Sequence, residues 1–85
     1  MACQTPEVQD ARESTQKFGA ALKEKRQHLG LSQEGLALKS GLDRSYVGGI
    51  ERGERNPSLT AITRLADGLG ISMHELFQYT EPDGR

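Results

Sequence analysis

The chain has 85 residues and a formal net charge of −1, and 34% of its residues are hydrophobic while 27% are charged. This length allows one small domain. The longest apolar run is too short to cross a membrane, and residues 1–14 lack the basic start and apolar core of a signal peptide. We therefore expect a cytoplasmic protein without membrane association, in which residues 1–14 form a disordered polar tail.

Residues that commonly bind metals or perform catalysis are few and scattered. Cys3 is the only cysteine, so it can form neither an internal disulfide nor a thiolate metal cage. His28 and His74 do not have the close spacing to other ligands or bases that a metal or catalytic site requires. No phosphate-binding glycine loop or nucleophile elbow occurs. We expect no metal, no cofactor, no small-molecule ligand and no enzymatic activity.

The charges are unevenly distributed along the chain. Residues 17–55 contain eight basic and five acidic residues, a net charge of +3, whereas the remainder contains three basic and seven acidic residues, a net charge of −4. The position of charge matters more for nucleic-acid binding than the total. This distribution permits a modestly basic face.

Five segments combine helical spacing of apolar residues with a polar capping residue. The predicted helices are 15–29, 33–40, 44–52, 59–69 and a short one through Phe77 that opens with a Ser72–Glu75 capping box. The expected N-caps are Ser14 or Thr15, Ser32, Asp43, Ser58 and Ser72. No strand-like alternation occurs, so we predict an all-α domain over residues 15–78, followed by a flexible C-terminal tail, 79–85.

The second and third predicted helices fit a helix-turn-helix. Ala37 is small where two helices would approach closely, and Gly41 stands at the turn, where a positive φ is expected. The inward positions are all apolar: Leu36, Leu42, Val47 and Ile50. An arbitrary helical hairpin is the alternative, but it would not need a small or apolar residue at all six of these positions.

The stretch LDRSYVGGIERGERNPS, within a segment from Phe18 to Phe77, resembles the phage repressor and Cro type of helix-turn-helix domain, and most closely the controller proteins of restriction-modification systems. The resemblance implies a compact five-helix, lambda-repressor-like fold. It also implies a homodimeric transcriptional regulator that binds a double-stranded, pseudo-palindromic operator and controls its own gene and the adjoining endonuclease gene. RNA polymerase is a further candidate partner. The alternative is an antitoxin-type or other phage-like repressor with a role in protein–protein interaction.

One charged residue lies on an apolar helical stripe. Arg26 follows Phe18 and Leu22 at steps of four and precedes Leu29 by three. A buried guanidinium needs a partner, and Glu51, four residues after Val47, also faces inward. The family resemblance implies an ion pair between Arg26 and Glu51. The alternative is that both charges reach solvent.

The first turn of the third helix supplies the candidate base contacts Arg44, Ser45 and Tyr46, because the N-terminal end of a recognition helix enters the major groove. The guanidinium of Arg44 can donate two hydrogen bonds to guanine. Tyr46 has an alternative role as a half-buried packing residue. Gly48 and Gly49 follow Arg44 and Ser45 by four, and their missing side chains would allow a close approach of the helix backbone to DNA.

Further polar residues are candidates for contacts with the DNA backbone: Gln33, Lys39, Arg52, Arg55 and Asn56. Gln33 starts the second helix, where free amides could bind a phosphate. Lys39 has an alternative role as a solvated surface charge.

A homodimer is expected because a few base contacts discriminate weakly. Its predicted interface is Ile71, Met73, Leu76 and Phe77, with a core-only role as the alternative.

Overall fold

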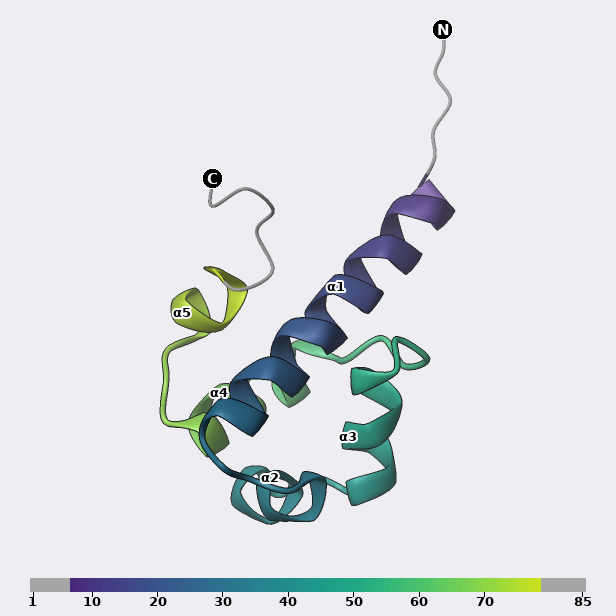
Figure 1. Ribbon diagram of the computed structural model, residues 1–85. Coiled ribbons are helices and arrows are strands. Elements are labelled where there is room, and N and C mark those ends of the chain that lie inside the picture. The colour runs from purple at the N-terminus through teal and green to yellow at the C-terminus, as the bar shows by residue number, and fades with distance from the viewer. Residues whose placement is uncertain (1–6, 79–85) are drawn as a thin grey trace, which may run out of the picture.

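The computed structural model describes residues 7–78, with side chains from Glu13 onward, and this part of the chain is built from five helices without a strand. The helices are α1 (Glu7–His28), α2 (Gln33–Ser40), α3 (Arg44–Glu51), α4 (Leu59–Leu69) and α5 (Met73–Gln78). Helix α1 packs on α3 and α5, while α2 packs on α3 and α4. The N-terminal part of α1 extends beyond the other helices (Figure 1). The predicted all-α fold class is confirmed.

Helix α1 begins at Glu7, eight residues before the predicted start. Residues 7–14 were predicted to belong to a disordered tail, and for these residues that prediction is wrong. They contain no Gly or Pro and include several good helix formers, but they have no apolar face, which is the signal that the prediction relied on. Cys3, the rest of the N-terminal tail and the tail 79–85 lie outside the described residues.

The other helix boundaries follow the capping residues closely. Ser32 accepts a hydrogen bond from the Gly35 N–H at 2.9 Å, and Ser58 accepts one from the Ala61 N–H at 3.1 Å. Ser72 and Glu75 form the expected reciprocal capping box. Helix α3 ends at Glu51, one residue before the prediction, because Arg52 is its C-cap.

The core is a single cluster of apolar residues from all five helices. Its members are Phe18, Leu22, Leu36, Ala37, Val47, Ile50, Leu65, Ala66, Leu69 and Leu76.

The burial of two leucines differs from the predictions. Leu29 is 43% exposed because α1 ends one residue earlier, and Leu76 has no exposed surface, so it belongs to the core and is removed from the predicted dimer interface.

Helices α1 and α3 approach closely at Gly19. A Cβ atom at this position would lie well inside van der Waals contact with the Ile50 carbonyl oxygen and 2.9 Å from the Glu51 carbonyl oxygen. Only glycine lets the two backbones meet in this way. Gly19 therefore sets the position of α3 relative to α1, and sequence reasoning did not identify it.

Candidate nucleic-acid interface

The turn between α2 and α3 has the geometry that its sequence predicts. Gly41 adopts a left-handed conformation with φ 69°, and the N–H of Leu42 donates to the Ala37 carbonyl at 3.0 Å. Ala37 is buried, with 3% of its surface exposed. The turn leads directly into α3, whose first residues, Arg44 and Ser45, are exposed. The polar side of the α3 N-terminus is therefore open to a ligand.

Asp43 caps the N-terminus of α3. One of its carboxylate oxygens accepts hydrogen bonds from the N–H of Ser45, at 3.2 Å, and from the Ser45 hydroxyl. The hydrogen bond from the Ser45 side chain is the main cause that lowers the pKa of Asp43. In the free protein the Ser45 hydroxyl is thus a donor to Asp43, and its lone pairs are left to accept from a base or another donor.

Tyr46 connects α3 to the start of α4. Its ring is half-buried against the core, and its hydroxyl oxygen accepts a hydrogen bond from the Ser58 N–H at 3.3 Å. The Arg55 guanidinium lies over the ring, 5.8 Å from its centroid. These contacts support the alternative packing role of Tyr46. The hydroxyl hydrogen can still donate to a DNA phosphate, so base or phosphate contact by Tyr46 stays a prediction.

The two adjacent glycines of α3 are buried beneath side chains of the same chain. A Cβ at Gly48 would lie 3.1 Å from Arg52 Nη1 and 3.3 Å from Gln33 Oε1. A Cβ at Gly49 would lie 2.6 Å from Arg55 Cγ. The glycines therefore make room for these long side chains, a use that sequence reasoning missed. Their close approach to DNA stays a prediction.

Arg26 and Glu51 form the expected ion pair in the interior. Arg26 Nε lies 2.6 Å from Glu51 Oε2, Arg26 Nη2 lies 3.0 Å from Oε1, and Nη1 donates to the Leu31 carbonyl at 2.7 Å. Arg26 is 7% exposed and Glu51 8%. Gln33 Nε2 also donates to Glu51 Oε1 at 3.0 Å. This network holds the start of α2 against the end of α3, and the participation of Gln33 was not anticipated.

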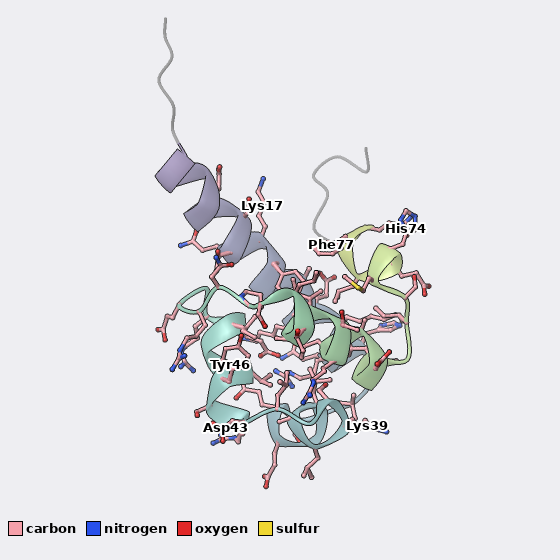
Figure 2. The ribbon with its side chains drawn as sticks, turned by 180° about the vertical axis from the view of Figure 1, so that it is seen from behind. Lys17, Lys39, Asp43, Tyr46, His74 and Phe77 are labelled. Carbon is pink, nitrogen blue, oxygen red and sulfur yellow. The ribbon has the colours of Figure 1, made fainter. Side chains whose placement is uncertain are left out.

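The remaining candidates for DNA-backbone contact are exposed. Arg52, Arg55 and Asn56 lie in the segment that follows α3, and Lys39 lies in the last turn of α2. Lys39 and Asp43 lie at the end of the molecule formed by α2 and the start of α3, Tyr46 lies further along α3, and His74 and Phe77 lie with α5 near the opposite end (Figure 2). A common DNA-binding side for these residues stays a prediction.

Helices α4 and α5 present a partly exposed apolar surface. Phe77 is 40% exposed, and its ring centroid lies 6.0 Å from that of Phe18. Ile71 and Met73 are half-buried against the core. Leu59, at the first position of α4, is 69% exposed and was not included in the predicted interface. The sequence predicts that Leu59 lies on the apolar side of α4, and only the packing of the helices shows that this residue is exposed.

Among the side chains that the structure describes, residues 13–78, no group of three or more His, Cys, Asp or Glu could hold a metal ion. None of the described helices is both long and apolar enough to span a bilayer.

A family model described as helix-turn-helix matches residues 22–76, from the last third of α1 through most of α5. The chain belongs to the helix-turn-helix family. One relative is control protein C.MunI of a Mycoplasma species, which is 41% identical over 68 residues; the match covers 79% of this chain and 92% of the relative. Control protein C.BamHI of Bacillus amyloliquefaciens is 42% identical over 50 residues, 59% of this chain and 62% of the relative.

Solved structures of helix-turn-helix controllers have the same fold. The restriction-modification controller protein C.AhdI from Aeromonas hydrophila superposes with a TM-score of 0.72 and 60% identity, over 74% of this chain and 96% of that one. The controller C.Esp1396I, solved as a tetramer in complex with its natural 35 base-pair operator, gives a TM-score of 0.75 and 36% identity, over 79% of this chain and 88% of that one.

Proposed function

We propose that this protein is a sequence-specific, DNA-binding transcriptional regulator that acts as a restriction-modification controller. The observation that carries the proposal is the exposed first turn of α3, a helix that is joined to α2 by the Gly41 turn and held against α1 by the interior Arg26–Glu51 pair. The names of similar proteins support it, since C.MunI is a control protein and C.Esp1396I was solved on its operator. The activity is binding rather than catalysis, and its place is the cytoplasm.

In this proposal α3 enters the major groove with its N-terminal turn. Arg44 is exposed at the first position of α3, where its planar guanidinium can donate to the O6 and N7 atoms of guanine. Ser45 contacts a base or a phosphate beside it. Gln33 at the start of α2 and the cations after α3 bind phosphates and fix the register without reading sequence.

A homodimer makes the readout selective. Each mismatched base pair discriminates by only about 1–3 kcal/mol, so one copy of α3 is not sufficient in a genome. We place the dimer interface on Ile71, Met73 and Phe77, together with Leu59, because α4 and α5 leave apolar surface exposed there. A two-fold dimer requires a pseudo-palindromic operator with half-sites about 34 Å apart. RNA polymerase is the further partner that transcriptional activation would require.

Fluorescence anisotropy tests this proposal with the DNA upstream of the protein's own gene and a scrambled duplex of equal length. Arg44→Ala is expected to weaken binding to the upstream DNA by about 1–3 kcal/mol and to change binding to the scrambled duplex much less. The matched control is Lys23→Ala, which removes an exposed charge from α1. Equal binding of the wild type to both duplexes would contradict the proposed function.

A further inference from the structure

An exposed ion pair follows the C-terminal end of α3, the proposed recognition helix. Arg52 Nε is 3.1 Å from Glu54 Oε1, and the two side chains are 58% and 62% exposed. The backbone of Glu54 is fixed, because its N–H donates to the Gly49 carbonyl at 2.9 Å. Exposed pairs of this kind contribute little to folding stability. The pair therefore has little effect on the stability of the domain, but it influences which groups Arg52 can contact.

The guanidinium of Arg52 lies back along α3. Arg44, Gly48 and Arg52 succeed one another at steps of four, so they share one face of the helix, and helical side chains lean toward the N-terminus. The absent side chain of Gly48 makes room for Arg52 Nη1, which would be 3.1 Å from a Cβ at that position. Arg52 is thus held on the same stripe as the proposed base-reading Arg44.

The contact with Glu54 restricts what Arg52 can do. A carboxylate bound at Nε leaves the Nη groups of the guanidinium available and favours the orientation in which they lie back along α3. A free arginine on this surface could instead swing to any nearby phosphate, and such contacts strengthen binding to all sequences. The negative charge of Glu54 also repels phosphates that approach without the correct register.

We propose that Glu54 is a specificity-determining residue, which orients Arg52 and opposes indiscriminate phosphate contact. This inference rests on the proposed DNA-binding function. It assigns Glu54 a positioning role: Glu54 acts through Arg52 and does not itself read a base. Loss of the carboxylate then strengthens binding to arbitrary DNA more than binding to the operator.

The test uses the full chain with Glu54→Ala and Glu54→Gln, and with Glu24→Gln as a control that removes an exposed acid from α1. The probes are the upstream duplex and a scrambled duplex, measured by anisotropy over a range of salt concentrations. We expect Glu54→Ala to bind the scrambled duplex about tenfold more tightly, with a salt slope steeper by about 1, because Arg52, which in the wild type reaches a phosphate only in the operator register, then neutralises one phosphate on any sequence. Operator affinity should change by less than about threefold.

Glu54→Gln should give a smaller effect in the same direction, since its amide oxygen can still accept from Arg52 Nε. Glu24→Gln should match the wild type on both probes. Equal changes of Glu54→Ala on the two probes, no change on either, or an unaltered salt slope would overturn the inference. If the wild type still prefers the upstream duplex, such a result refutes only the role of Glu54, and the proposed function stands. If the wild type binds both duplexes equally, the proposed function and the inference are both refuted.

Discussion

Arg26 and Glu51, 25 positions apart in the sequence, form a bidentate ion pair that is almost completely buried and joins α1 to the last residue of α3. Every nitrogen of the guanidinium has an acceptor, because the Leu31 carbonyl binds the third. Burial of two charges is tolerated only with such complete pairing. The pair therefore fixes where the recognition helix lies.

Replacement of Arg26 by Ala should destabilise the domain strongly. It leaves the Glu51 carboxylate buried without its ionic partner, and breaking a buried pair in this way costs about 3–5 kcal/mol. Urea unfolding followed by circular dichroism measures the change. The double variant Arg26→Met, Glu51→Leu removes both charges and should recover most of the loss. A single variant within about 1 kcal/mol of the wild type would show that the pair is not important for stability.

Gly19→Ala should destabilise the protein although alanine is the better helix former. Helix propensity alone would add about 1 kcal/mol, but the new Cβ meets the backbone oxygens of Ile50 and Glu51, which cannot move without shifting α3. We expect a net loss of about 2 kcal/mol, because overpacking against backbone is not relieved by a rotamer change. Ala20→Gly, at the neighbouring exposed position, should cost only about 1 kcal/mol. A gain of stability in Gly19→Ala would be inconsistent with the close crossing.

Gly48→Ala should weaken operator binding without unfolding the domain. The added methyl group displaces Arg52 Nη1 and Gln33 Oε1, which are ends of flexible side chains. It also fills the surface where we expect DNA to approach α3. The expected loss is about 1 kcal/mol of binding free energy, or close to fivefold in Kd. If both Gly48→Ala and Gly49→Ala bind the operator as well as the wild type, close approach is the wrong explanation for these glycines.

Leu59→Asp should weaken dimerisation and leave the monomer folded. Leu59 is 69% exposed at the first position of α4, where a negative charge is favourable for the helix. Sedimentation velocity should show a shift from dimer to monomer. Leu38→Asp is the control, because Leu38 is 78% exposed on α2, outside the proposed interface. An unchanged dimer in Leu59→Asp would remove this residue from the interface.

The sequence predicts those parts of the fold that local rules control. The boundaries of α2 and α4 follow from Ser32, Ser58 and the glycines that end both helices, because caps act over one turn of chain. Helical spacing placed Arg26 and Glu51 on inward faces, and the family resemblance implied that they pair. The all-α fold class and the turn at Gly41 also follow from local patterns: the helical spacing of apolar residues and a glycine where the chain needs a positive φ.

Other features depend on contacts between distant segments. Gly19 has the sequence context of an ordinary helical residue, and only the approach of α3 reveals its role. Leu76 was expected at the surface, since a helix as short as α5 gives too little periodicity to show which side is covered. The hydrogen bond from Gln33 to Glu51 joins the start of α2 to the end of α3, so no local sequence pattern predicts it.

The most direct test of the central claim is a titration of the ¹⁵N-labelled protein with the DNA upstream of its own gene, followed by amide NMR shifts. If the exposed start of α3 reads the operator, the largest changes should occur at Ser45, Gly48 and Gly49 and at the start of α2, while the outward positions of α1, such as Lys23 and Glu24, stay nearly unchanged. Changes concentrated on the outer side of α1, with the α3 amides unaffected, would contradict the account.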